Sequence, residues 1–167
     1  MESNSASVFS IRQATRDDLD LLLAWRRAMF LDMGTADAAQ LDAALPRFAE
    51  WLCAQWARED RCRALLGEVD GTPVTCAIVW IYDWYPGARD TSTRRGYILN
   101  VYTLPAWRRH GFADRLVQAG VAWLRERGIR SVSLHASAQG QSVYARQGFR
   151  ALPLHEMALR LDEDVPQ

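Results

Sequence analysis

The sequence has no lysine, and its charges cancel. All 20 of its permanently cationic residues are arginine, and 20 aspartate and glutamate residues match them in number, so the formal net charge at pH 7 is zero. A balanced charge provides no long-range attraction toward nucleic acid or toward an anionic membrane surface. We therefore expect neither a nucleic-acid partner nor a membrane partner. The absence of lysine also means that the chain cannot be acetylated on lysine side chains of its own.

Cysteine is scarce, and long apolar runs are absent. Cys53, Cys62 and Cys76 are odd in number and lack the spacing of metal ligands, so we interpret them as reduced thiols and expect no metal site. No apolar stretch approaches the roughly 20 residues that span a membrane. The polar segment from Met1 to Ser7 does not resemble a signal peptide. Together these absences predict a cytoplasmic location.

The length and composition fit one globular domain. With 167 residues, of which 49% are hydrophobic and 24% are charged, the chain can bury a sizeable core. We predict a disordered segment over residues 1–8, a folded domain over 9–161 and a frayed tail over 162–167. The expected order is one strand, two helices, three strands, a helix, a strand, a helix and two closing strands. This order defines an α/β domain with a mixed sheet.

Periodicity and turn residues give the approximate bounds of these elements. Gly34 closes the first helix, Asp70-Gly71 makes a hairpin turn, and Pro46 interrupts or re-caps the second helix. The predicted strands cover residues 9–14, 63–69, 72–82, 97–104, 131–135, 149–152 and 156–161, and the predicted helices cover residues 15–34, 38–59, 111–127 and 141–147.

The most specific local pattern joins the strand at 97–104 to the helix that follows. There the chain reads Pro105-Ala106-Trp107-Arg108-Arg109-His110-Gly111-Phe112-Ala113. The free N–H groups of such a turn and of the first helical residues converge, and the helix dipole adds partial positive charge. Arg108 and Arg109 add full charges. The segment therefore predicts a site for a phosphate or pyrophosphate.

The spacing Arg108-x-x-Gly111-x-Ala113, after a strand and a proline, resembles the acyl-CoA signature of the GNAT superfamily of N-acyltransferases. A second cluster, Tyr144-x-x-x-Gly148-Phe149 at the end of a short helix, is similar to a later motif of that superfamily. The resemblance covers residues 97–161 clearly and residues 9–82 more weakly. It implies a single-domain GNAT-like fold, in which helices flank a mixed, splayed β-sheet, and it implies acetyl-CoA as the cosubstrate.

The resemblance also implies where acetyl-CoA binds. The sheet would open between the strand that ends at Leu104 and the strand that ends at Ala136, and the pantetheine arm would enter there. Backbone groups of the central strand would pair with the arm, and the turn would hold the pyrophosphate. The implied cofactor-binding residues are Val101, Tyr102, Thr103, Arg108, Arg109, His110, Gly111, Phe112, Ala113, Ser137 and Tyr144.

Acetyl transfer requires a neutral amine, a stabilised oxyanion and a proton for the leaving thiolate. Tyr144 is the candidate acid, because a phenol with a pKa of about 10 is protonated at pH 7. No carboxylate lies between Gly96 and Leu104; Asn100 stands there instead, and an amide cannot act as a base. Asn100 could orient a water molecule or the amine. Deprotonation stays open between a water chain, an amine that arrives neutral and a carboxylate from elsewhere, with Glu68, Asp83 and Asp32 as candidates.

The first helices and the loop after the third strand would form the acceptor site. We expect Trp84, Tyr85 and Asp32 to bind the acceptor, with the two aromatic rings making cation–π contacts to the amine. The loop aromatics could instead fold onto their own domain or form a dimer contact.

The predicted activity is direct acetylation of a primary amine of a small molecule. A homodimer is possible. Two alternatives stay open: a non-catalytic acyl-CoA-binding or sensing module, and a peptide N-terminal acetyltransferase. A different nucleotide-phosphate binder ranks last, since the P-loop and Gly-x-Gly-x-x-Gly patterns are absent.

Overall fold

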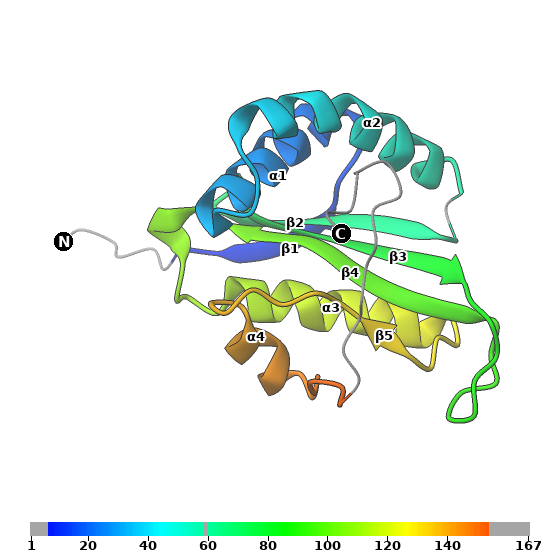
Figure 1. Ribbon diagram of the computed structural model, residues 1–167. Helices are drawn as coiled ribbons and strands as arrows, with labels where there is room; N and C mark the ends of the chain where they lie inside the picture. Colours follow the sequence, from blue (N-terminus) through cyan, green and yellow to red (C-terminus); the bar gives the residue numbers. More distant parts are fainter. Residues whose placement is uncertain (1–6, 59, 154–167) are drawn as a thin grey trace.

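The computed structural model describes residues 7–58 and 60–153. Five strands form one sheet in the order β1-β2-β3-β4-β5, with α1 and α2 on one face and α3 and α4 on the other (Figure 1). The α/β prediction is therefore confirmed. The strands are β1 (Phe9–Gln13), β2 (Cys62–Val69), β3 (Thr72–Asp83), β4 (Arg94–Thr103) and β5 (Val132–Ser133), and the α-helices are α1 (Leu19–Met33), α2 (Ala38–Trp56), α3 (Phe112–Glu126) and α4 (Gln141–Arg146).

The sheet is mixed. Strands β1 to β4 are antiparallel neighbours, whereas β5 runs parallel to β4 after the crossover through α3. The predicted hairpin turn is confirmed: Asp70 and Gly71 have φ angles of +50° and +79°, and Val69 pairs with Thr72. Positive φ at both central residues matches the twist of the flanking strands, which explains the Asp-Gly pair.

Alternation along β3 divides the core into two layers. Cys76 and Ile78 point toward α1 and α2, where they pack with Leu22 and Leu52. Val79 and Ile81 point toward α3, where they pack with buried residues such as Val117 and Leu124. A position on the central strands therefore faces either the α1/α2 side or the α3/α4 side of the sheet.

Helix α2 continues through Pro46, so the predicted interruption is wrong. Proline removes one backbone N–H bond and normally costs about 3 kcal/mol inside a helix. Here Leu41 and Leu52, on either side of Pro46, are both buried. Burial of the same helix on both sides of the proline offsets that local cost.

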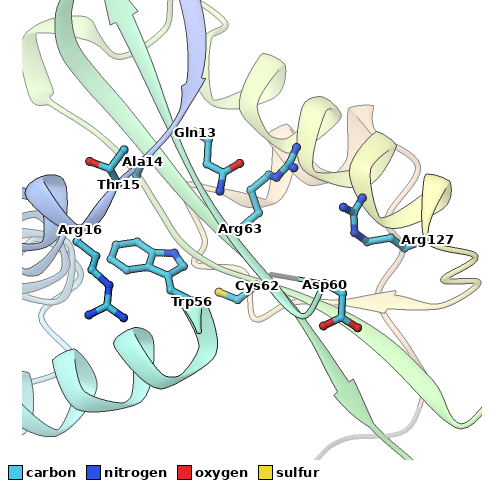
Figure 2. Close-up of a pocket in the computed structure, with 9 residues that line it drawn as sticks. All are labelled: Gln13, Ala14, Thr15, Arg16, Trp56, Asp60, Cys62, Arg63 and Arg127. Carbon is cyan, nitrogen blue, oxygen red and sulfur yellow. The ribbon is translucent and has the colours of Figure 1, made fainter. Parts of the chain in front are cut away.

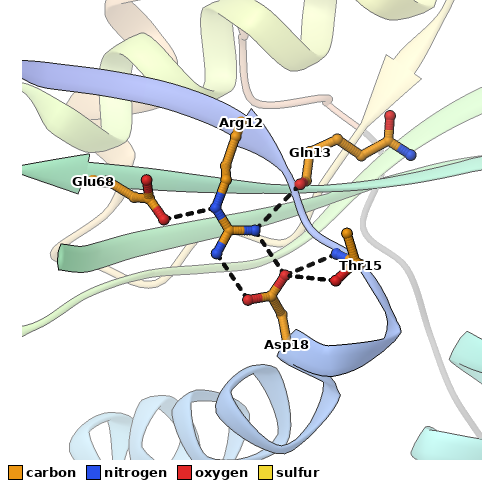
Figure 3. A network of polar contacts seen from close by, with 5 residues as sticks. All are labelled: Arg12, Gln13, Thr15, Asp18 and Glu68. Atoms are coloured by element: carbon orange, nitrogen blue, oxygen red, sulfur yellow. Dashed lines mark hydrogen bonds and ion pairs between the residues drawn. The ribbon is translucent and has the colours of Figure 1, made fainter. Parts of the chain in front are cut away.

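An ion-pair network ties β1 to the start of α1 (Figure 3). The guanidinium of Arg12 donates to both carboxylate oxygens of Asp18 (2.7 and 2.8 Å) and to Glu68 on β2 (2.6 Å). Asp18 also accepts the backbone N–H of Thr15 at 2.8 Å, which caps the turn before α1. The network fixes the point at which the chain leaves the sheet.

The remaining differences lie in the C-terminal part. The strand expected at 131–135 is reduced to two residues, and residues 149–152 form no strand. The strand expected at 156–161, like most of the segments expected to be disordered or frayed, lies outside the described residues. Gly34 follows α1 with a φ of +64°, as predicted for the end of that helix, and Gly128 follows α3 with a φ of +71°. No described helix is long and apolar enough to cross a membrane.

Candidate active site

The sheet opens beside the C-terminal half of β4. Strand β5 pairs with β4 only at Gly96–Val132 and Tyr97–Ser133, whereas β4 continues to Thr103. Figure 1 shows the backbone that follows β5 diverging from β4 beyond that point. The predicted splay is therefore present. The edge of β4 that carries Val101, Tyr102 and Thr103 has no strand partner on the β5 side among the described residues.

A β-bulge lies at the point where the sheet opens. Cys76 pairs with Tyr102 and Ile78 with Leu99, so Asn100 and Val101 together oppose the single residue between Cys76 and Ile78. Asn100 has a φ of +56°, a conformation that asparagine tolerates better than most residues. The bulge turns consecutive backbone groups of β4 away from the regular ladder.

Asn100 is occupied by protein contacts. The residue is only 3% exposed. Its Oδ1 accepts a hydrogen bond from the guanidinium of Arg26 at 3.2 Å. Its backbone carbonyl accepts from the thiol of Cys76 at 3.2 Å. These contacts engage the side-chain oxygen and the backbone carbonyl of Asn100 and hold the bulge in place.

The turn between β4 and α3 presents free backbone donors. Gly111 has a φ of +78°, and α3 begins at Phe112. The structure shows no hydrogen bond from the N–H groups of Gly111, Phe112 or Ala113 to any described residue; the first such bond in α3 comes from Arg115 to Gly111. Three consecutive free N–H groups at a helix start are suited to bind a phosphate.

The basic residues of the turn differ in exposure and in their contacts. Arg109 is exposed, with a φ of +64°. Arg108 folds back: its Nε donates to the carbonyl of Thr103 (3.0 Å) and its terminal nitrogen pairs with Asp32 of α1 (2.5 Å). His110 donates from Nδ1 to the carbonyl of Arg108 (2.8 Å). Of the two arginines, Arg109 is therefore the one whose charge is available to a ligand.

Acidic charge near the turn is also neutralised. The first turn of α3 contains Asp114, which would repel a bound pyrophosphate if it faced the turn. The structure pairs it instead with Arg146 of α4 through two hydrogen bonds of 3.0 and 2.8 Å. This pair also attaches α4 to α3.

Tyr144 projects from α4 toward the α3 side of the sheet. Its ring packs edge-on against Phe149, with 6.0 Å between centroids, and contacts the core layer that contains Val79 and Ile98. Burial, with a smaller contribution from Tyr97, raises the pKa of Tyr144 above its usual value. Its hydroxyl makes no hydrogen bond to a described residue. Nearby, the Ser137 hydroxyl accepts the Gly140 N–H at 3.2 Å.

The predicted acceptor residues do not lie together. Asp32 adjoins the end of β4, where its carboxylate accepts from the Tyr102 hydroxyl at 3.4 Å. Trp84 and Tyr85 follow β3 beside the start of β4, and the N–H of Trp84 donates to the carbonyl of Thr93. Asn100 lies six positions after Arg94, the first residue of β4, which is roughly 20 Å along the strand. One small amine cannot contact both groups.

Trp84 and Tyr85 belong to a row of aromatic side chains that includes three of the seven tryptophans. Ring contacts continue from α2 and along β3 to the exposed loop, with neighbouring centroids 4.9–5.7 Å apart, through Phe48, Trp51, Trp80, Tyr82, Trp84 and Tyr85. Trp84 and Tyr85, 47% and 69% exposed, are its outer end.

A separate cavity lies at the opposite end of the sheet from the turn. It has a volume of about 620 Å³ and is bordered by Gln13, Ala14, Thr15, Arg16, Trp56, Asp60, Cys62, Arg63 and Arg127 (Figure 2). None of the predicted site residues lines it. Among the described residues, no group of three or more histidine, cysteine or acidic side chains could hold a metal ion.

Sequence reasoning missed Arg26. The residue lies on the apolar stripe of α1, four positions after Leu22 and four before Phe30. An arginine among apolar residues at helical spacing indicates a charge directed toward the protein interior, and that signal was present in the sequence.

Comparisons with known proteins agree with this geometry. A family model described as "Acetyltransferase (GNAT) family" matches residues 21–149. A GCN5-related N-acetyltransferase from Ralstonia eutropha is 31% identical, with a TM-score of 0.83 over 91% of this chain and 99% of that one. A predicted acetyltransferase from Clostridium acetobutylicum, solved with acetyl-CoA, is 26% identical, with a TM-score of 0.81 over 92% and 97%.

A more distant structure shares the fold alone. The aminoglycoside N-acetyltransferase AAC(6')-Iy, solved with CoA, is 20% identical, with a TM-score of 0.72 over 95% of this chain and 98% of that one. The comparison with curated proteins finds no match.

Proposed function

Because the chain belongs to the acetyltransferase (GNAT) family, an acetyl-CoA-dependent family of enzymes, we propose that it transfers the acetyl group of acetyl-CoA directly to a primary amine of a small molecule. The observation that carries this proposal is the opening of the sheet at the Asn100 bulge, next to the free N–H groups of the turn. The prediction of a GNAT enzyme that uses acetyl-CoA is confirmed by the family match and by the solved structures. The residue roles and the acceptor class are our proposal.

Acetyl-CoA would bind along the open edge of β4. We assign the pantetheine arm to the backbone of Val101, Tyr102 and Thr103, and the pyrophosphate to the free N–H groups from Gly111 to Ala113, with Arg109 supplying charge. Arg108 would act indirectly, since it ties the end of β4 to α1 through Thr103 and Asp32. Ser137 and His110 would shape the two ends of the site.

The transfer would be direct from bound acetyl-CoA to the amine, without a covalent acyl-enzyme. The amine nitrogen forms a bond to the thioester carbonyl carbon, a backbone N–H near Tyr102 stabilises the oxyanion, and the carbon–sulfur bond breaks. Tyr144 donates its phenolic proton to the departing thiolate, and its raised pKa keeps that proton in place at neutral pH. The proton lost from the amine leaves through water.

The three carboxylates considered for the base are all engaged. Glu68 pairs with Arg12 at 2.6 Å, Asp83 with Arg61 at 2.9 Å and Asp32 with Arg108 at 2.5 Å. Only Asp32 lies beside the open part of β4. We therefore assign Asp32 to positioning and expect the amine to arrive neutral.

The test is turnover. Purified protein with acetyl-CoA and a panel of primary amines should release free CoA, detected by a thiol reagent, and should yield the acetylated amine, detected by mass spectrometry. Release of CoA without an acetylated amine would exclude the proposed transfer. Tight binding of acetyl-CoA with no turnover would favour the sensing module, and turnover of peptides alone would favour a peptide N-terminal acetyltransferase.

A further inference from the structure

Arg26 of α1 carries a charge that no described carboxylate balances. Its neighbour Arg27 pairs with Asp42 at 2.7 Å, and Asp32 of the same helix pairs with Arg108 at 2.5 Å. No aspartate or glutamate among residues 7–58 and 60–153 lies within 4.0 Å of the Arg26 guanidinium. Two adjacent arginines on one helix thus differ in whether the protein supplies a counter-ion.

The guanidinium is nevertheless held firmly. Its central carbon lies 3.8 Å from the ring centroid of Phe48 and 4.8 Å from that of Phe30. One terminal nitrogen donates to Asn100 Oδ1 at 3.2 Å. A guanidinium has five N–H donors, and no other one bonds to a described residue. Two rings and one amide therefore hold the group, and its other donors have no partner among the described residues.

Burial is the cause of the shifted pKa of Arg26. Removal from solvent lowers the pKa of Arg26 to about 10, and no nearby charge contributes to that shift. The group is still cationic at neutral pH. A partly buried cation without a counter-ion gains more from an anionic ligand than an exposed one would, because water screens it less.

Arg26 lies next to the proposed place of acetyl transfer. Its partner Asn100 directly precedes the backbone segment that we assign to the pantetheine arm. Arg26 reaches the bulge from the α1/α2 side of the sheet, whereas Tyr144 packs on the α3/α4 side. If Tyr144 protonates the leaving thiolate from one side, the acceptor approaches from the side of Arg26.

We infer that the acceptor is an amine that also carries a carboxylate, and that Arg26 binds this carboxylate. The inference rests on the function proposed above and narrows its substrate class to amino carboxylates. The planar fork of a guanidinium matches the two oxygens of a carboxylate, and the flanking rings orient it beforehand. A single arginine suits the single charge of a carboxylate better than the nearly double charge of a phosphate monoester.

The test compares amino acids with their amides, which have the same amine but no negative charge. For each pair, kcat/KM is measured with the wild type, Arg26→Gln and Arg27→Gln. For each variant, the ratio of kcat/KM for the acid to kcat/KM for the amide is divided by the same ratio for the wild type. The effect of the different amine pKa values then cancels. We expect the ratio to fall roughly 10- to 100-fold in Arg26→Gln, the loss expected for one charge-assisted pair.

Arg27→Gln is the matched control, since Arg27 has its own partner in Asp42, and its ratio should stay within twofold of the wild type. Arg26→Lys keeps the charge without the planar fork and should show an intermediate loss. Thermal stabilisation by acetyl-CoA checks that each variant is folded.

An unchanged ratio in Arg26→Gln, with both acids and amides turned over, would overturn the inference and leave the proposed function intact. A preference for phosphorylated amines over amino carboxylates would also overturn it. Binding of acetyl-CoA with no turnover of any amine would instead contradict the proposed function, and the inference would fall with it.

Discussion

Replacing Tyr144 by phenylalanine should lower kcat about 100-fold or more without unfolding the protein. The substitution removes only a hydroxyl that makes no hydrogen bond to a described residue. The edge-on contact with Phe149 and the packing against the core layer on the α3 side do not involve that oxygen. The expected change in the free energy of unfolding is therefore within about 0.5 kcal/mol.

The expected size of the kinetic effect follows from the role of a positioned acid. General acid catalysis contributes about 100- to 10,000-fold. The pKa of Tyr144 is raised by its burial, so the phenol is fully protonated at neutral pH, and the variant loses the whole contribution of the acid. The KM for acetyl-CoA should stay near the wild-type value, because the backbone of β4 and the turn are unchanged.

The assay is steady-state release of CoA at saturating acetyl-CoA and amine, with the acetylated product confirmed by mass spectrometry. Tyr82→Phe is the matched control, since Tyr82 belongs to the aromatic row and not to the proposed machinery. A decrease of less than threefold in kcat for Tyr144→Phe, in a step shown to be limited by chemistry, would refute the assignment of Tyr144 as the acid.

Three further predictions concern stability and the acceptor. Arg12 lowers the pKa of Asp18 to about 2. Asp18→Asn should therefore lower the free energy of unfolding by about 1 kcal/mol at pH 7, after allowance for the partly exposed pair. This difference should vanish as the pH falls from about 4 to about 2, as measured by urea unfolding at several pH values. A Cβ at Gly120 would lie 2.7 Å from Val79 Cγ2. Gly120→Ala should therefore destabilise the protein by about 1–3 kcal/mol and lower Tm by roughly 2–12 °C in calorimetry. An unchanged Tm would mean that α3 does not pack this closely against β3. Trp84→Ala should leave KM for small amines within twofold of the wild type, because Trp84 lies roughly 20 Å along the sheet from the bulge, and a large increase in KM would show that the acceptor reaches the loop.

Much of the fold could be predicted from local patterns. Asp70-Gly71 identified the hairpin, and Gly34 identified the end of the first helix, because each needs a backbone conformation with positive φ. The turn from β4 into α3 was recognisable from the spacing of its proline, arginine and glycine. Such features depend on a few adjacent residues and therefore show in the sequence.

Features set by tertiary packing could not be predicted. The continuity of α2 through Pro46 depends on burial of Leu41 and Leu52 against the rest of the protein. The bulge at Asn100 depends on how β3 and β4 align, and nothing in the alternation of β4 marks it. Strand β5 is short because the backbone there diverges from β4 after two pairs, and not because strand-forming residues are lacking.

The candidate site shows the same division. The turn and Tyr144 belong to local motifs, whereas Asp32 and Trp84 were expected to meet because the first helices and the loop after β3 were expected to form one acceptor site. They lie at different ends of β4. The ion pair between Asp32 and Arg108 joins residues far apart in sequence, so no local pattern could reveal that Arg108 folds away from the turn.

The most direct test of the account is a thermal-shift titration with acetyl-CoA, CoA and ATP in parallel. A ligand at about 100 times its Kd stabilises the protein by about 2.7 kcal/mol, which corresponds to a rise in Tm of roughly 5–11 °C for a domain of this size. We predict that acetyl-CoA and CoA both raise Tm by this amount and that ATP does not, since only the first two carry a pantetheine arm for the open edge of β4. No shift with acetyl-CoA would contradict the proposed binding of acetyl-CoA between β4 and β5.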